Sequence, residues 1–178
     1  MTMPQIIETE RLVLRPMALS DADAVMTHLT FDVAKYLTSV PWPYARSDAE
    51  DYLSMASTTP GLYAVTCAGD YIGAMGYETE LGYWLAEPSW GQGYATEAAR
   101  AVRDAAFENT DVEVDRSGFA RANTASGNVL AKCGFTGDGY RTAMLNQNRE
   151  RCVLRRVSLT RADWQALTAG SDTAKRQT

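Results

Sequence analysis

A length of 178 residues suits one ordinary domain, and 46% apolar with 22% charged residues is a globular composition, not that of a disordered or collagen-like chain. No run approaches the roughly 18 apolar residues of a membrane span, and no basic and apolar leader opens the chain, so we expect a soluble protein without a membrane partner. The net charge of −5 opposes binding to a nucleic-acid backbone, so no nucleic-acid partner is expected.

The first part of the chain predicts one strand and three helices. Residues 11–16 alternate apolar and polar side chains and stop at a proline, as a half-buried strand does. A serine followed by two aspartates opens a helix over 20–29, and a short helix is expected over 33–37. The Pro-Trp-Pro-Tyr segment 41–44 excludes regular structure, because proline blocks a helix at itself and at its predecessor. A capping box at Ser47 then starts a helix that ends near residue 57.

The middle of the chain predicts antiparallel strands followed by a long helix. Strands over 62–67 and 71–77 are joined by a tight Ala-Gly-Asp turn, and 80–86 forms a third, aromatic-rich strand. From 94 to 107, alanines and other apolar residues recur at helical spacing, with the charged residues mostly off that face. This pattern predicts a helix that packs closely on one side.

The last third alternates strands and helices. The expected elements are a strand over 111–121, a helix over 124–132, a turn over 137–139, a strand over 152–159 and a final helix from Thr160. Gly134 suits a left-handed helix C-cap. No repeat, low-complexity block or linker divides the chain. We therefore expect one α/β domain with a mixed sheet over residues 1–170 and a disordered tail over 171–178.

The cysteines argue against a disulfide framework or a zinc site. Cys67, Cys133 and Cys152 are odd in number and far apart, and His28 is the single histidine. We therefore predict a reducing, cytoplasmic compartment and no metal.

A glycine-bearing turn before the long helix is the most informative segment. Gly91 and Gly93 allow backbone amides to point at one place, which they share with the positive end of the helix dipole. An anion such as a pyrophosphate fits there. The alternative is a turn that uses glycine for structural reasons alone. Thr96 stands where the dinucleotide fingerprint needs a small residue, and no P-loop Gly-Lys-Ser/Thr is present.

The chain resembles the GNAT superfamily of N-acetyltransferases, in particular the branch of ribosomal-protein alanine N-acetyltransferases. The superfamily motif Gln/Arg-x-x-Gly-x-Gly/Ala falls on 90–95, with Trp90 replacing the first residue, as is usual in that branch. Four further segments agree in order and spacing: Thr-Glu-Arg-Leu-Val-Leu-Arg-Pro at 9–16, Pro-Trp-Pro-Tyr at 41–44 with Asp-Ala-Glu at 48–50, Glu-Leu-Gly-Tyr-Trp-Leu at 80–85, and Asn-Thr-Ala-Ser at 123–126 with Lys-Cys-Gly-Phe at 132–135. The resemblance spans about residues 8–160.

This resemblance implies a GNAT-like fold, with a mostly antiparallel central sheet, one splayed pair of parallel strands and flanking helices. It also implies acetyl-CoA as the acetyl donor, with the pantetheine pairing beside the strand that ends at 84–86. The pyrophosphate would lie on the amides of the 92–95 turn, and no metal is required. The implied cofactor-binding residues are Trp84, Leu85, Ala86, Gln92, Gly93, Tyr94, Ala95, Thr96, Asn123 and Ser126.

The resemblance further implies direct attack of an amine on the acetyl thioester while both substrates are bound. Glu80 matches a carboxylate that acts as a base in several members, directly or through water, and its alternative is a solvent-facing charge. Glu78 and Asp115 are lesser candidates that we interpret as solvated charges. Many relatives place a tyrosine general acid where this chain has Leu130, so Ser126 is the implied hydrogen-bond donor to the departing thiolate. The alternative role of Ser126 is helix capping.

The acceptor remains open between a protein N-terminus and a small-molecule amine. Trp42 and Tyr44 lie in the region that walls the acceptor site in relatives, although loop aromatics also serve as core plugs. An α-amine with a pKa near 8 is far more often unprotonated at neutral pH than a lysine amine near 10.4, which favours low-pKa amines. The chain is expected to be a monomer or a homodimer. The alternative function is a non-catalytic acyl-CoA-binding sensor, suggested by the missing tyrosine.

Overall fold

The computed structural model describes residues 2–145 and 150–175, in which eight strands form one sheet. The strands are β1 (Ile7–Glu8), β2 (Leu12–Pro16), β3 (Leu62–Cys67), β4 (Asp70–Tyr77), β5 (Leu81–Leu85), β6 (Val114–Ala120), β7 (Thr136–Leu145) and β8 (Glu150–Thr160). Their spatial order is β1-β2-β3-β4-β5-β6-β8-β7. The neighbours are antiparallel except β5 and β6, which are parallel. The predicted fold class, an α/β domain with a mixed and mostly antiparallel sheet, is confirmed.

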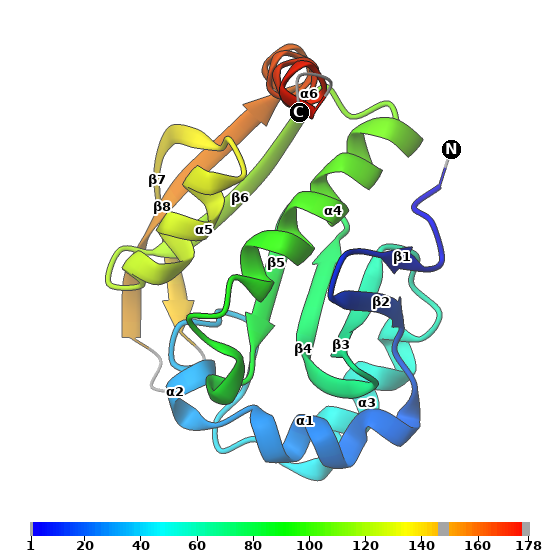
Figure 1. Ribbon diagram of the computed structural model, residues 1–178. Coiled ribbons are helices and arrows are strands. Elements are labelled where there is room, and N and C mark those ends of the chain that lie inside the picture. Colours follow the sequence, from blue (N-terminus) through cyan, green and yellow to red (C-terminus); the bar gives the residue numbers. More distant parts are fainter. Residues whose placement is uncertain (1, 146–149, 176–178) are drawn as a thin grey trace.

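Helices cover both faces of this sheet (Figure 1). They are α1 (Ala22–His28), α2 (Phe31–Ala34), α3 (Arg46–Ala56), α4 (Tyr94–Asn109), α5 (Thr124–Lys132) and α6 (Arg161–Lys175), with short 3-10 turns η1 (Leu19–Asp21) and η2 (Glu87–Ser89). Helices α4 and α5 share one hydrophobic cluster with the sheet, and α1, α2 and α3 share a second one. The Trp164 ring of α6 stacks on Phe107 of α4, with 5.1 Å between the ring centroids. None of the helices in the described residues is both long and apolar enough to cross a membrane.

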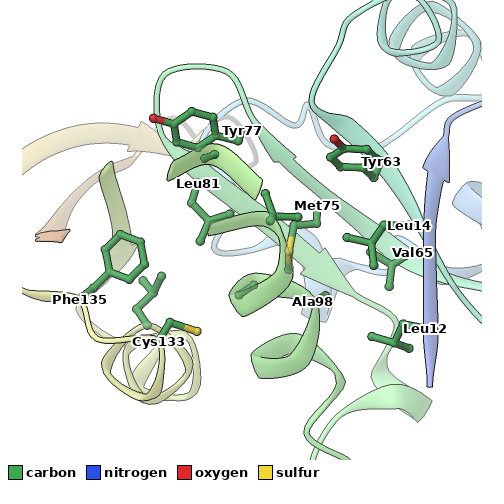
Figure 2. Close-up of a cluster of buried hydrophobic side chains, with 14 of the residues drawn as sticks. Leu12, Leu14, Tyr63, Val65, Met75, Tyr77, Leu81, Ala98, Cys133 and Phe135 are labelled. Carbon is green, nitrogen blue, oxygen red and sulfur yellow. The ribbon is translucent and has the colours of Figure 1, made fainter. Parts of the chain in front are cut away.

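The larger core fixes α4 against the sheet. Figure 2 shows Leu12, Leu14 and Met75 of the strands gathered beside Ala98 of the helix. The sheet-facing positions Ala98, Ala99 and Ala106 of α4 are fully buried, as the alanine spacing predicts. Small side chains let the helix lie close to the strands, so the start of α4 is held at a set place beside β5.

Strands β5 and β6 separate soon after they meet. Among the described residues their one register pair is Leu81 and Ser117, and the Ser117 hydroxyl donates to the Leu81 carbonyl at 2.7 Å. Further on, β5 pairs only with β4 on its other edge, and β6 pairs with β8. The facing edges therefore carry main-chain groups without a strand partner, an arrangement that accepts an extended ligand.

Two predicted helix starts are displaced. The helix predicted over 33–37 is α2, which begins earlier, at Phe31. Helix α3 begins at Arg46 and not after a Ser47 cap, because the Asp48 carboxylate accepts the Ala45 amide at 2.8 Å. The Arg46 guanidinium also bonds Glu50 within the helix at 2.9 Å. This favours a helix that includes Arg46.

The C-terminal part differs most from the prediction. The segment predicted as a turn over 137–139 lies inside β7, where the register shifts between Gly137 and Tyr140 and Gly139 has a φ of 99°. It is a bulge in an edge strand whose side chains are mostly exposed, so no pattern of buried residues marks it. Helix α6 continues to Lys175, past the domain boundary predicted at residue 170. The last three positions of the predicted tail, 176–178, lie outside the described residues.

Candidate active site

Two cavities meet at strand β5. One, of about 630 Å³, lies among the α4 start, α5 and β5, and the other, of about 840 Å³, extends toward α3 and β7. Tyr36, Leu37, Tyr83 and Trp84 line both cavities. Successive β5 side chains point to opposite faces of the sheet, so Tyr83 packs with the α4 cluster and Trp84 with the α1–α3 cluster. The two cavities therefore communicate beside the place where β5 and β6 diverge.

Most of the predicted cofactor-binding residues line the 630 Å³ cavity. Those that do are Trp84, Leu85, Gly93, Tyr94, Ala95, Thr96, Asn123 and Ser126. Ala86 and Gln92 do not: Ala86 is buried with its amide bonded to the Ile72 carbonyl at 2.8 Å, and the Gln92 side chain donates to the Pro88 carbonyl. The structure therefore gathers segments 84–85, 93–96 and 123–126 around one space.

The start of α4 forms a cradle for an anion. Gly91 and Gly93 have φ angles of 74° and 83°, in the left-handed region that favours glycine. Gly93 is the N-cap and supplies no side-chain oxygen to the first turn, whose early amides have no acceptor within the helix. Tyr94, Ala95 and Thr96 of that turn line the cavity. Unshared amides and the positive end of a 16-residue helix dipole suit a pyrophosphate.

The segment between β1 and β2 braces this cradle through a charged network. Arg11 donates from Nη1 to the Gln92 carbonyl at 3.0 Å, pairs with Glu97 at 2.7 Å, and lies 4.6 Å from the Tyr94 ring centroid. The Thr9 hydroxyl donates to the same Glu97 carboxylate at 2.6 Å. Burial raises the pKa of Glu97, but the hydrogen bonds from Thr9 and Arg11 outweigh it and hold that pKa below its ordinary value. An ionised Glu97 thus anchors the arginine that supports the turn.

At the open edge of β5, one main-chain group already has a hydrogen-bond partner. The Ala86 amide bonds β4, so by alternation the main chain of Leu85 faces the other edge. Its carbonyl accepts the Trp90 indole N–H at 2.8 Å. Trp90, which replaces the usual first residue of the superfamily motif, therefore ties the glycine turn to the end of β5.

Ser126 lies beside a tyrosine hydroxyl. Tyr83 Oη is 2.9 Å from Ser126 Oγ and 3.2 Å from the Ser126 carbonyl. Asn123 caps α5 by accepting the Ser126 amide at 3.2 Å, so the capping role belongs to Asn123 and not to Ser126. Leu130 is fully buried in the core. Burial raises the pKa of Tyr83, while its bond to Ser126 opposes that rise.

Glu80 lies in the other cavity, apart from Ser126. Its carboxylate pairs with Arg141 of β7 at 3.2 Å, and both residues line the 840 Å³ space. Three further carboxylates, Asp48, Asp51 and Glu78, line the same space, whose one basic lining residue among those described is Arg141. This cavity has an acidic wall.

The two predicted acceptor-site aromatics are placed differently. Tyr44 lines the 840 Å³ cavity, and burial, with smaller contributions from Asp48 and Tyr52, raises its pKa to about 12. Trp42 is not part of that lining and packs edge-on against Phe31 at 5.4 Å. Trp42 therefore matches the alternative interpretation, in which a loop aromatic packs against the core.

Asp115 is a buried group that sequence reasoning placed in solvent. It is fully buried in β6, and neither carboxylate oxygen has a hydrogen-bond partner in the described structure. Burial raises its pKa to about 7, while the Arg116 main-chain amide and the Arg103 side chain lower it and Glu80 raises it. The solvated interpretation of Asp115 is wrong, and the residue lines neither cavity.

The described residues contain no group of three or more histidine, cysteine, aspartate or glutamate side chains that could hold a metal ion. Cys67, Cys133 and Cys152 are free thiols. Burial raises the pKa of Cys133 to about 11, although nearby arginines oppose that rise. This thiol is therefore protonated at neutral pH and is not an activated nucleophile.

Comparisons with known proteins agree with this geometry. The family described as Acetyltransferase (GNAT) domain matches residues 11–136. The chain is similar to the uncharacterized N-acetyltransferase p20 of Bacillus licheniformis, at 26% identity over 151 residues that cover 76% of this chain and 84% of that protein. Its fold resembles a GNAT-family acetyltransferase from Bacillus anthracis, with a TM-score of 0.80, 20% identity, and coverage of 88% and 99%. It also resembles the ribosomal L7/L12 alpha-N-protein acetyltransferase RimL in complex with coenzyme A, with a TM-score of 0.73, 19% identity, and coverage of 87% and 97%.

Proposed function

As a member of the GNAT family, this chain is an N-acetyltransferase that uses acetyl-CoA, and we propose that it passes the acetyl group directly to a primary amine while both substrates are bound. The observation that carries the proposal is the pair of cavities that meet at Tyr83 and Trp84. One cavity has the anion cradle and the other has the acidic wall. Donor and acceptor can thus approach the same point from two sides, as direct transfer requires.

The residues of the 630 Å³ cavity fit the donor. The first-turn amides of α4 would hold the pyrophosphate, and Lys132 in the cavity lining adds a positive charge. The Leu85 main-chain amide faces the open edge of β5 and would pair with the pantetheine arm, while the Leu85 carbonyl accepts the Trp90 indole. Acetyl-CoA, when bound there, supplies an activated thioester carbonyl.

Glu80 is our proposed base. A general base must accept the proton that the attacking ammonium loses, and a carboxylate in the acceptor cavity can do so directly or through one water. The Arg141 guanidinium, which comes from edge strand β7, orients this carboxylate. On the donor side, the Ser126 hydroxyl is the proposed hydrogen-bond donor to the departing thiolate, since Leu130 offers none.

The acidic wall supports a cationic acceptor. Asp48, Asp51, Glu78 and Glu80 outnumber Arg141 in the lining, so the cavity attracts an ammonium group before it is deprotonated. A site with one carboxylate base handles an α-amine, with a pKa near 8, more easily than a lysine amine near 10.4. We therefore propose a protein N-terminus or a small low-pKa amine as acceptor. The likeness to an enzyme named for an α-N-protein substrate is in line with the first of these.

A second candidate function is a non-catalytic acyl-CoA-binding sensor. The observation that favours it is Leu130, which is fully buried where many relatives carry a catalytic tyrosine. Acetyl transfer to any amine would exclude this sensor.

The test begins with acetyl-CoA binding. At 100 times its Kd, the ligand adds about 2.7 kcal/mol to the free energy of unfolding, which raises Tm by roughly 5–10 °C for a chain of this length. Thiol release is then followed over a panel of peptides with free N-termini, the same peptides with blocked N-termini, and small amines. Release that requires a free amine supports the proposal. A Tm rise without release over the whole panel favours the sensor, and no Tm rise at millimolar acetyl-CoA contradicts both.

A further inference from the structure

Tyr83 lines both cavities, and among the described residues its hydroxyl group forms hydrogen bonds only with Ser126. It is 2.9 Å from Ser126 Oγ and 3.2 Å from the Ser126 carbonyl oxygen. Ser126 lines only the 630 Å³ cavity, which we call the donor cavity. Glu80 lines only the 840 Å³ cavity, which we call the acceptor cavity, and Tyr83 lines both. Tyr83 is therefore the residue that links Ser126, the proposed hydrogen-bond donor, to the shared lining of the two cavities.

The position of the Tyr83 hydroxyl can be compared with that of the α5 tyrosine that many relatives carry in place of Leu130. Ser126 and Leu130 are four residues apart on this helix and so lie on one face, a turn from each other. Leu130 fills the core at its turn, while the Tyr83 phenol reaches the same face from β5 at the Ser126 turn. A phenol thus stands beside this face of α5, supplied by a strand and not by the helix.

Two arrangements of the hydroxyl hydrogens fit these distances. The phenol either donates to the Ser126 carbonyl and accepts the serine hydrogen, or donates to Ser126 Oγ. The Ser126 amide is bonded to Asn123, so it does not compete for either hydroxyl. If the Tyr83 hydroxyl donates across the shorter distance to Ser126 Oγ, the serine hydrogen is free to point into the donor cavity. Burial raises the pKa of Tyr83, so the phenol keeps its hydrogen at neutral pH.

We propose that Tyr83 is a positioning residue that donates to Ser126 Oγ and directs the serine hydroxyl at the departing sulfur. The inference rests on the proposed acetyl transfer and deepens it. A serine that accepts one hydrogen bond is a better donor for the next, because hydrogen bonds in a chain polarise one another. The pair then acts as one donor toward the thiolate.

The step balances without an extra proton donor. The amine nitrogen forms a bond to the acetyl carbon, and its proton passes to Glu80 or water. The carbon–sulfur bond breaks, and its electron pair stays on sulfur. A thiol with a pKa near 8.5 is more acidic than a phenol near 10, so the sulfur leaves as a thiolate that accepts a hydrogen bond and no proton from the pair.

Kinetics of Tyr83→Phe test this role. We expect kcat with acetyl-CoA to fall about tenfold, the factor that one neutral hydrogen bond supplies, with an unchanged KM for acetyl-CoA. With acetyl-seleno-CoA, whose selenolate is a better leaving group, the deficit should largely vanish. Ser126→Ala and the double variant should lose about the same factor, because the two groups act as a unit. The proposal would be overturned if Tyr83→Phe lost the same factor in kcat with acetyl-CoA and with acetyl-seleno-CoA. It would also be overturned if the kcat losses of the two single variants added up in the double variant.

Tyr63→Phe is the matched control. Tyr63 is also a buried tyrosine whose hydroxyl bonds a main-chain carbonyl, that of Pro4 at 2.6 Å, but it lines neither cavity. It should lose comparable thermal stability while keeping the wild-type kcat. A similar kcat loss in this control would mean that Tyr83→Phe acts through the fold.

A binding measurement tests the same contact without an acceptor. The thiol of bound CoA is titrated by its ultraviolet thiolate absorbance, against the same protein with desulfo-CoA. We expect its pKa to lie below about 8.5 in the wild type and to rise by roughly half a unit to one unit in Tyr83→Phe. An unshifted thiol in the wild type would overturn the role of Tyr83. Lowered values in a protein that acetylates no amine would contradict only the proposed acetyl transfer.

Discussion

The guanidinium of Arg11, the residue before strand β2, donates a hydrogen bond to the main-chain carbonyl of Gln92, in the glycine turn before α4, at 3.0 Å. The same side chain pairs with Glu97 and lies over the Tyr94 ring. One residue from the first part of the chain therefore contacts the glycine turn and the first turn of the helix that would bind the pyrophosphate. The segment Thr-Glu-Arg at 9–11 thus has a defined place in the site, because Thr9 and Arg11 share the Glu97 carboxylate.

Arg11→Lys should weaken CoA binding about tenfold with little change in kcat. Lysine keeps the charge but loses the planar fork that spans Gln92 and Glu97. Isothermal titration with CoA measures the effect. Arg46→Lys is the control, since Arg46 also bonds two partners, Asp23 and Glu50, but neither of them belongs to the glycine turn or to α4. Equal affinities for Arg11→Lys and wild type would show that the turn holds its shape without the fork.

Gly91→Ala should weaken CoA binding at least tenfold. The residue has a φ of 74°, where a Cβ is strained, so the turn must shift and move its amides away from the pyrophosphate. Gly69→Ala in the β3–β4 turn is a matched control: its φ is 94°, and neither added Cβ would meet an atom within 4 Å. Both variants should lose about 1 kcal/mol of stability, but only Gly91→Ala should lose affinity. If Gly91→Ala and Gly69→Ala lost the same affinity for CoA, the proposed pyrophosphate site at the glycine turn would be contradicted.

Glu80→Gln should lower kcat by about 100-fold or more and leave CoA binding unchanged. The amide is nearly isosteric but accepts no proton, and general-base catalysis contributes about 10²–10⁴-fold. Steady-state kinetics at one fixed pH, together with isothermal titration of CoA, checks this. Glu108→Gln, on the exposed side of α4, serves as the control. A wild-type rate in Glu80→Gln would assign the proton transfer elsewhere.

Asp115→Asn should change how stability depends on pH. The folded carboxyl has a pKa of about 7, against about 3.9 when unfolded, so the folded state holds the extra proton between these values. The contribution of Asp115 to stability is therefore greatest below about pH 4 and falls as the pH rises toward 7, beyond which it is constant. Relative to wild type, Asp115→Asn should gain about 2–3 kcal/mol between pH 5 and pH 8. Urea unfolding of both proteins at pH 5 and pH 8 measures this. If the free energy of unfolding changed with pH by the same amount in Asp115→Asn and in wild type, the raised pKa would be contradicted.

Local sequence patterns predicted most elements. The helix expected over 124–132 is α5 with the same bounds, and the strand expected over 62–67 is β3. These segments have strong signals in their own residues, such as the left-handed C-cap at Gly134 and a run of apolar residues. Strand β7 was missed because an exposed edge strand has no buried side to impose a two-residue period.

The candidate site was predictable only in part. The glycine turn was found because a strand, two glycines and a helix start lie in one stretch of chain. Tyr83, Arg11 and Arg141 were not assigned roles, since each acts on a residue more than 40 positions away: Ser126, Gln92 and Glu80 respectively. Their one local signal was that Arg11 and Tyr83 lie within segments shared with the GNAT superfamily.

The sequence by itself predicted the fold class and the glycine turn before α4, because helical periodicity, strand alternation and glycine turns are properties of short segments. The GNAT family followed from the resemblance of five such segments. Only the tertiary structure decided that Glu80 and Ser126 lie in different cavities, and that Tyr83 stands between them. It also decided that Asp115 is buried. Sheet order and the divergence of β5 from β6 bring distant residues together, and burial removes their water. These effects depend on the packing of the whole domain.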